Sequence, residues 1–199
     1  MIPFVLTAAL AYVIGTSNLA FFLSKWKRVD MRHKGSGNLG TSNALIVLGW
    51  WAGILVFIHD AGKVILAILI SKYFYPDLPM IGFVAGVAGV LGHIYPFYLR
   101  FRGGKGFASF LGMIAALNWK FFFLIVLMIA VLTLVTDYIV VSTVATVVVY
   151  PAYIAWQLSL IPACIILVAS LIILFKHREN YVRIYHGTEI GFRSAGLKK

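Results

Sequence analysis

The sequence has little charge, few acidic residues and a single cysteine. Charged residues make up 12% of its 199 residues, about half the ~25% of an ordinary soluble domain, whereas 62% are hydrophobic. A soluble domain of this length leaves much of its surface exposed, and so few charges do not cover that much apolar area. The composition also excludes a disordered chain, a collagen and a secreted disulfide scaffold. The sequence therefore predicts an integral membrane protein.

Missing residues exclude several further chemistries. Cys164 is the one cysteine and lies in an apolar run, so an intrachain disulfide and a CxxC metal or redox site are excluded. Histidine, cysteine and acidic residues do not occur at metal-ligand spacing, and we predict no metal site. The chain also has no carboxylate pair suited to glycosidase chemistry and no G-x-S-x-G motif.

Long apolar runs fill most of the chain and predict an all-α fold. A spanning helix needs about 20 mostly apolar residues, and the first run is too long for the core of a signal peptide. Turn and breaker residues separate seven runs, which are 2–23, 44–71, 80–99, 107–118, 121–136, 138–159 and 160–175. We expect about seven transmembrane helices, some short or broken, in a single polytopic membrane domain over residues 1–199.

Basic residues set the expected orientation of these helices. With the N-terminus outside, fourteen Lys and Arg residues fall on the inner side, in loop 25–42, loop 100–106 and the tail 176–199. Only Lys72 and Lys120 then remain outside, so the positive-inside rule predicts an outside N-terminus and an inside C-terminus. We therefore explain the formal net charge of +11 by the membrane topology and by binding of anionic lipids or substrates, and not by binding of a nucleic acid.

Two glycine-rich loops are candidate phosphate sites. Residues 35–43 read G-S-G-N-L-G-T-S-N, in which the glycines bring backbone N–H groups close to an anion. A flexible inter-helix loop is the alternative, and a dinucleotide motif is rejected because no strand precedes it. Residues 92–106 end in G-G-K-G, where Lys105 suits a phosphate counter-charge. A basic loop that contacts anionic lipid headgroups is the alternative there.

Two other polar segments fall on the same predicted membrane face. His177 and Asn180, in segment 177–189, share a face if the last helix continues, although a snorkelling basic helix end is the alternative. The hydroxyl groups of segment 137–143 either face a site or bond the carbonyl four residues back. Four segments far apart in the sequence thus converge on one surface, which indicates a site for a phosphate-bearing molecule.

Asp60 and Lys63 lie three residues apart within a predicted membrane helix. Ionisable groups in such helices are costly and usually face the bundle interior. A structural ion pair is the simpler interpretation of these two residues, and a direct catalytic role is the alternative.

The motifs, in this order, resemble those of the PlsY family of bacterial membrane acyltransferases, which transfer an acyl group from acyl phosphate to glycerol 3-phosphate. The family pattern G-S-G-N-x-G-x-x-N matches 35–43, and G-H-x-x-P-x-x-x-x-F-x-G-G-K-G matches 92–106. The pattern H-R-x-N-x-x-R-x-x-x-G-x-E matches 177–189, and D-x-x-K matches Asp60 and Lys63. The resemblance implies a seven-helix inner-membrane enzyme with a cytoplasmic active site, lysophosphatidic acid as product, and no metal or organic cofactor.

The resemblance also implies a set of site residues. The candidate catalytic residues are Ser36, Thr143, His177 and Asn180. The candidate substrate-binding residues are Asn38, Asn43, His93, Arg102, Gly103, Gly104, Lys105, Gly106, Ser142 and Glu189. Lys105 would bind phosphate with the amides of residues 103–106, and Glu189 would brace the third motif.

The sequence departs from the family pattern at four positions. Ile46 stands where the family usually has Arg, Asp137 stands where it has a basic residue, and Val140 and Thr143 stand where it has two serines. An acyltransferase with a different acceptor is therefore an alternative, as is a non-catalytic lipid-binding or scaffold protein. A small transporter of an anionic metabolite also fits broken helices and an intramembrane ion pair, but it predicts polar groups on both membrane faces.

Overall fold

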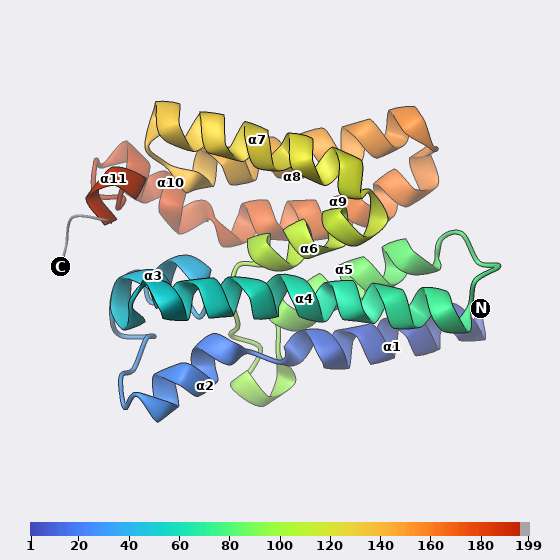
Figure 1. Cartoon of the computed structure of the whole chain (residues 1–199), viewed down its shortest axis with the longest axis horizontal. Helices are drawn as coiled ribbons and strands as arrows, with labels where there is room; N and C mark the ends of the chain where they lie inside the picture. The colour runs from blue at the N-terminus through green and yellow to red at the C-terminus, as the bar shows by residue number, and fades with distance from the viewer. Residues whose placement is uncertain (196–199) are drawn as a thin grey trace. The chain divides into compact units, whose positions relative to one another are not determined.

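The computed structural model describes residues 1–195, so Lys198 and Lys199 of the expected cytoplasmic tail lie outside the described residues. Between residues 1 and 195 the chain forms helices and contains no strand, as the apolar runs predict (Figure 1). The chain divides into two compact units, Met1–Leu117 and Asn118–Lys199.

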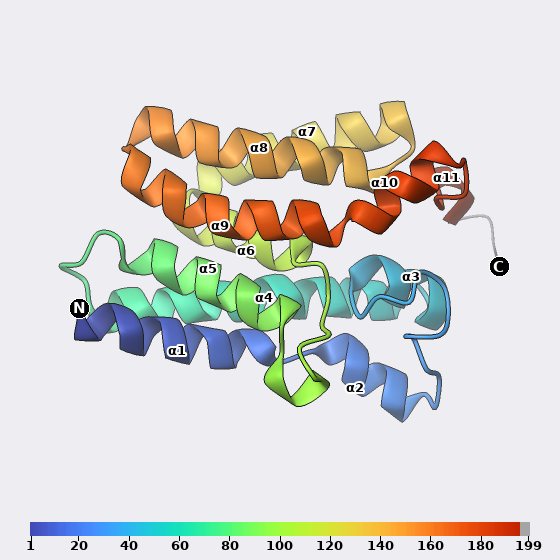
Figure 2. The ribbon, with the colours of Figure 1, turned by 180° about the vertical axis from the view of Figure 1, so that it is seen from behind.

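Unit 1 is built around its longest helix, α4. Its elements are α1 (Ile2–Thr16), α2 (Leu19–Trp26), α3 (Thr41–Leu48), α4 (Trp50–Phe74), α5 (Ile81–Ile94), the short 3-10 helix η1 (Phe97–Leu99) and α6 (Phe107–Leu117). Helix α4 contacts α1, α3, α5 and α6. Within this unit α2 and α3 lie at the end opposite the N-terminus (Figure 2).

Small residues allow the close contact between α1 and α5. A Cβ atom added to Gly92 of α5 would overlap the backbone of Tyr12 and Gly15 in α1. Membrane helices commonly associate through small residues, because dispersion contacts between backbones replace the hydrophobic driving force that lipid does not supply. This contact fixes the end of α5, from which the second glycine-rich loop leaves.

Two of the predicted runs are interrupted. Run 2–23 is broken at Ser17 and Asn18, because the Asn18 side chain accepts a hydrogen bond from the Phe21 N–H at 2.9 Å and so caps α2. Run 44–71 is broken at Gly49, which separates α3 from α4 and has a φ of 97°. These two runs are therefore broken helices, as expected for some of the seven segments.

Unit 2 is a bundle of three apolar helices with two short helices at one end. It comprises α7 (Trp119–Thr136), α8 (Ile139–Gln157), α9 (Leu160–Lys176), α10 (Arg178–Tyr185) and α11 (Phe192–Ala195). Helix α8 packs against both α7 and α9. The turn between α7 and α8 holds the C-terminal segment, because Asp137 accepts hydrogen bonds from the N–H groups of Phe192 and Arg193, each at 2.8 Å.

Five helices of the described chain are long and apolar enough to cross a membrane. By length and composition these are Ile2–Trp26, Trp50–Phe74, Ile81–Leu99, Trp119–Thr136 and Ile139–Gln157, where the first takes α1 and α2 as one span and the third takes α5 and η1 as one span. The pair α9 and α10, bent by 42°, would be a sixth span if it is one segment. The remaining expected segment, α6, is helical but has only 11 residues. All seven predicted runs are thus helical, and five or six reach spanning length.

Candidate active site

Asn43 organises the first glycine-rich loop from within. Its side chain is fully buried, and Oδ1 accepts a hydrogen bond from the Ser36 N–H at 2.8 Å. Its Nδ2 group donates to the carbonyls of Met31, Lys34 and Asn38 at 2.9, 3.1 and 3.0 Å. One carboxamide thereby contacts four backbone groups, with its two N–H donors shared among three carbonyls, and its polar atoms are used inside the protein.

Gly35 is required for this arrangement. Its φ is +60°, and a Cβ atom placed there would overlap Oδ1 of Asn43. A left-handed backbone and a close approach to a buried amide both favour glycine. The loop therefore presents Ser36 and Asn38, which are partly buried, on a fixed backbone.

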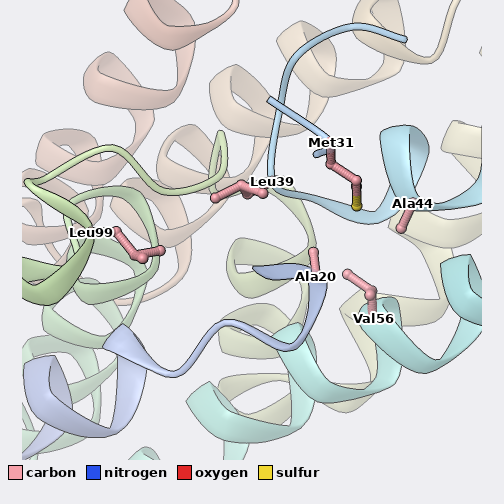
Figure 3. Close-up of a cluster of buried hydrophobic side chains, with 6 residues drawn as sticks. All are labelled: Ala20, Met31, Leu39, Ala44, Val56 and Leu99. Atoms are coloured by element: carbon pink, nitrogen blue, oxygen red, sulfur yellow. The ribbon is translucent and has the colours of Figure 1, made fainter. Parts of the chain in front are cut away.

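An apolar cluster anchors both ends of the same loop. Met31 and Leu39 flank the glycines and are 0% and 2% exposed. They pack with residues of α2, α3, α4 and η1, namely Ala20, Ala44, Val56 and Leu99 (Figure 3). Since both ends are buried in one core, the segment between them is held at the surface, unlike the flexible loop that the sequence left as an alternative.

Asp30 fixes the turn that enters this loop. Its carboxylate accepts a hydrogen bond from the Arg32 N–H at 3.0 Å and contacts Nδ1 of His33 at 2.8 Å. The Arg32 N–H, followed by the hydrogen bond with His33, lowers the pKa of Asp30. Because the group is exposed, we assign it a local turn role only.

The second glycine-rich loop folds back onto the end of α5. Two consecutive residues, Arg100 and Phe101, adopt left-handed conformations with φ of 54° and 59°, and this turn reverses the chain. The N–H groups of Gly103 and Gly104 then donate to the carbonyls of Ile94 and His93 at 3.0 and 3.2 Å. These two amides bond to the end of α5, and their expected role at a phosphate stays a prediction.

The two glycine-rich loops meet at Gly104. A Cβ atom at this position would lie 3.0 Å from the Leu39 carbonyl oxygen and would overlap Nε2 of His93. Only a glycine lets the second loop pass between the imidazole and the first loop. The first loop thus meets the second where Leu39, next to Asn38, lies against Gly104, next to the partly buried Lys105.

A buried ionic cluster lies beneath this contact. Asp60 and Lys63 pair at 3.1 Å, and their side chains are 2% and 5% exposed, which confirms the predicted ion pair. His93 joins it, with Nδ1 2.9 Å from Lys63 Nζ and 3.3 Å from an Asp60 oxygen. His93, a candidate substrate-binding residue, is itself buried in this cluster. Lys63 also lines a cavity of about 730 Å³ at the break between α1 and α2.

Removing one partner of the Asp60–Lys63 pair is expected to cost more stability than removing both. Asp60→Asn or Lys63→Met each leaves an uncompensated buried charge, a loss on the order of 3–5 kcal/mol, whereas the double variant leaves none. We expect thermal unfolding in detergent to show lower Tm values for both single variants and a partial recovery in the double variant. Additive losses would argue against the pair.

His177 lies at the bend between α9 and α10 in unit 2. It is 6% exposed, and its Nδ1 contacts the Ile173 carbonyl oxygen at 2.8 Å. A carbonyl only accepts, so Nδ1 carries the proton and a neutral ring presents Nε2 as an acceptor. The bend corrects the expectation that the last helix simply continues through this residue.

Glu189 braces the third motif, as the resemblance implies. Its two carboxylate oxygens accept hydrogen bonds from Asn180 Nδ2 and Arg183 Nε, each at 2.5 Å. Asn180 is buried, and its amide orientation is fixed by this contact. The expected bracing role of Glu189 is confirmed.

Ser142 and Thr143 are buried in the contact between α7 and α8. Thr143 donates to the Ile139 carbonyl four residues back at 3.1 Å, which is the structural alternative considered for this segment. Ser142 contacts the Thr133 hydroxyl at 2.8 Å and donates to the Ile129 carbonyl at 3.2 Å. The Ser142 hydroxyl thus joins α8 to α7, whereas the Thr143 hydroxyl bonds within α8.

The remaining candidates of the second loop differ in exposure. Arg102 lies on the surface of the second loop, whereas Gly106 is buried just before α6. Ile46, which stands where the family has Arg, is 38% exposed on α3. Among residues 1–195, no group of three or more His, Cys, Asp or Glu side chains is placed to hold a metal ion.

Sequence reasoning missed Ser17, Asn18 and Ser109, which connect elements of unit 1. The Asn18 side chain donates to the Leu39 carbonyl at 3.3 Å, and Ser109 donates to the Asp60 carbonyl at 2.9 Å. Asn18 lies within the apolar run 2–23. Because asparagine is a common helix N-cap residue, it predicts that a new helix begins there and could have revealed the break.

Comparison with known proteins places these motifs in a family. Residues 5–187 match the family model described as glycerol-3-phosphate acyltransferase. A protein of that name from Thermoanaerobacter pseudethanolicus is 40% identical, and the match covers 93% of this chain and 93% of the relative. Another, from Prochlorococcus marinus (strain MIT 9301), is 35% identical over 90% of this chain and 92% of the relative.

Solved structures agree with this match. The crystal structure of PlsY, an integral membrane glycerol 3-phosphate acyltransferase, in its glycerol 3-phosphate form has a TM-score of 0.90, 28% identity and 98% coverage of both chains. The lysophosphatidic acid form has a TM-score of 0.86 at 27% identity, covering 98% of this chain and 99% of that one. Since the family model and the relatives span nearly the whole sequence, this chain belongs to the glycerol-3-phosphate acyltransferase (PlsY) family of integral membrane proteins.

Proposed function

We propose that this protein transfers a fatty acyl group from an acyl phosphate to the hydroxyl of glycerol 3-phosphate, giving lysophosphatidic acid and inorganic phosphate. The observation that carries the acceptor is the pair of solved structures of one relative, PlsY, in a glycerol 3-phosphate form and in a lysophosphatidic acid form. The second molecule is the acylated product of the first. A transporter has no need to form that product.

The proposed step is a direct acyl transfer. The acceptor hydroxyl attacks the acyl carbonyl carbon, a new C–O ester bond forms, and the bond from the carbonyl carbon to the phosphate oxygen breaks. The hydroxyl proton leaves with a base or with the departing phosphate. Because phosphate is already a good leaving group, the reaction needs no covalent enzyme intermediate. The protein then acts mainly by aligning two substrates and stabilising developing negative charge.

The residues divide between these tasks. We assign a substrate phosphate to the Lys105 ammonium, and acceptor orientation to Ser36, Asn38 and Asn180. The fixed backbones around Asn43 and Gly104 support this assignment, because precise alignment needs rigid loops. His177 acts as general base or as hydrogen-bond donor, and the Nδ1 contact with Ile173 favours the base, since it leaves Nε2 as the acceptor.

An acyl-transfer assay with purified protein tests the donor and the acceptor together. We expect lysophosphatidic acid from acyl phosphate and glycerol 3-phosphate, and little product when acyl-CoA replaces acyl phosphate. Transfer from acyl-CoA alone would overturn the proposed donor. Transfer to another hydroxyl compound but not to glycerol 3-phosphate would overturn the proposed acceptor, and Ile46→Arg would then be expected to change the preference.

We further propose that the active site faces the cytoplasm of a bacterial inner membrane. Cysteines introduced at exposed positions in a Cys164→Ala background report the orientation. Lys34→Cys, Arg100→Cys and His186→Cys are expected to resist an impermeant thiol reagent in intact cells and to react after the cells are opened. Asp77→Cys, on the loop between α4 and α5, is the control that should react in intact cells. Labelling of the first three from outside would contradict the proposal.

A further inference from the structure

Lys63 is bonded to three different segments of unit 1. Its Nζ atom lies 2.5 Å from the Ser17 carbonyl oxygen, 3.1 Å from Asp60 Oδ1 and 2.9 Å from His93 Nδ1. An ammonium group has three donors and no acceptor, so each N–H has one of these partners. The three partners lie at the α1–α2 break, on α4 and on α5.

This geometry also fixes the tautomer of His93. Because Lys63 can only donate, the nearby Nδ1 of His93 accepts, and the proton of the neutral ring is on Nε2. Asp60 supplies the negative charge that balances the ammonium in this buried place. The imidazole is therefore held in one orientation by Lys63 and is not free to rotate.

One series of hydrogen bonds connects Lys63 to the first glycine-rich loop. The carbonyl of Ser17 belongs to the backbone break that the Asn18 cap creates. Asn18 is fully buried, and its Nδ2 donates to the Leu39 carbonyl at the end of the loop. Lys63 thus bonds to the Ser17 carbonyl, and the next residue, Asn18, bonds to loop 35–43.

A second series of hydrogen bonds connects Lys63 and Asp60 to the second glycine-rich loop. The His93 carbonyl accepts the Gly104 N–H at 3.2 Å, and the His93 ring packs against the Gly104 backbone. On the other side of this loop, Ser109 at the start of α6 donates to the Asp60 carbonyl at 2.9 Å. The segment 103–106 is therefore connected to the Asp60–Lys63 turn of α4 before it through His93 and after it through Ser109.

We infer that Lys63 is a positioning residue that sets both glycine-rich loops of the acyltransferase site through Ser17 and His93. This inference rests on the proposed function in one respect, which is that the two loops form part of the substrate site. Lys63 does not touch the substrates in this role. Its three-donor geometry is specific to an ammonium, because a planar guanidinium does not direct single donors to three separate elements.

Hydrogen exchange of the backbone amides tests the inference without a measurement of enzyme activity. In Lys63→Met, amides of segments 35–39 and 103–106 are expected to exchange about tenfold faster or more, while α7 and α8 in unit 2 keep their protection. Lys72→Met is the matched control, since it removes the same charge from an exposed position on α4 and should leave both loops unchanged. Faster exchange spread over both units would show a general structural role and would overturn the inference.

Steady-state kinetics of the folded variants provide a second test of the inference. We expect kcat/KM to fall on the order of 10²-fold in Lys63→Met, with little rescue by Lys63→Arg, because loop misplacement by a fraction of an ångström disturbs substrate alignment. The double variant Asp60→Asn/Lys63→Met is expected to regain stability without regaining activity, and it carries the same test if Lys63→Met does not fold. Wild-type transfer in this double variant would overturn the inference. Absence of transfer in the wild type would instead reject the proposed function and leave the exchange result to decide.

Discussion

Replacement of Lys105 by Met is expected to reduce acyl transfer severely while the protein still folds. Lys105 follows the Gly103–Gly104 pair, whose amides bond to carbonyls at the end of α5, and its ammonium is the group that we propose binds a substrate phosphate. Loss of a charge-assisted hydrogen bond to an anion costs about 1.5–3 kcal/mol, and loss of phosphate charge stabilisation adds to this. We expect a fall in kcat/KM on the order of 10²-fold or more in a steady-state assay.

Two further variants define what Lys105 contributes. Lys105→Arg should also be impaired, because a forked guanidinium does not replace a compact ammonium between buried glycines. Lys27→Met removes an exposed basic residue from the same predicted side of the membrane and should retain wild-type transfer. If Lys105→Met retained normal transfer, the phosphate would have to be bound elsewhere.

Loss of the His177 imidazole is expected to lower kcat by 10²–10⁴-fold, the usual contribution of a general base. Its Nδ1 is engaged with the Ile173 carbonyl oxygen, which directs Nε2 toward the base role in the neutral ring. A base must be deprotonated, so wild-type activity should fall toward acidic pH and give the pH–rate profile an acidic limb. In the pH–rate profile of His177→Ala, this acidic limb should be absent.

His177→Gln separates the two roles proposed for this residue. If His177 only donates a hydrogen bond, the glutamine amide should retain much of the rate and the acidic limb should remain. His186→Ala, in the same motif but exposed, is the matched control and should behave like the wild type. Wild-type rates in both His177 variants, together with normal transfer by Lys105→Met, would place the active site elsewhere.

Composition and local patterns alone determine the class of this protein and its motifs. Hydropathy predicts the helices because a chain in lipid must satisfy its backbone hydrogen bonds internally. The Asp60–Lys63 pair is also predictable, since an isolated charge in such a helix is costly and a partner three residues away lies on the same face. The bracing by Glu189 followed from the resemblance, because it depends on a local motif.

The tertiary structure decides what the polar residues of the motifs do. Asn43, Ser142 and Thr143 carry groups that suit a substrate, yet their polar atoms bond within the protein. The distinction depends on which distant backbone groups remain to be satisfied, such as the four that Asn43 serves, and no local sequence window contains that information. The same holds for Gly104, because its need for glycine arises from Leu39 and His93, which meet it only in the folded chain.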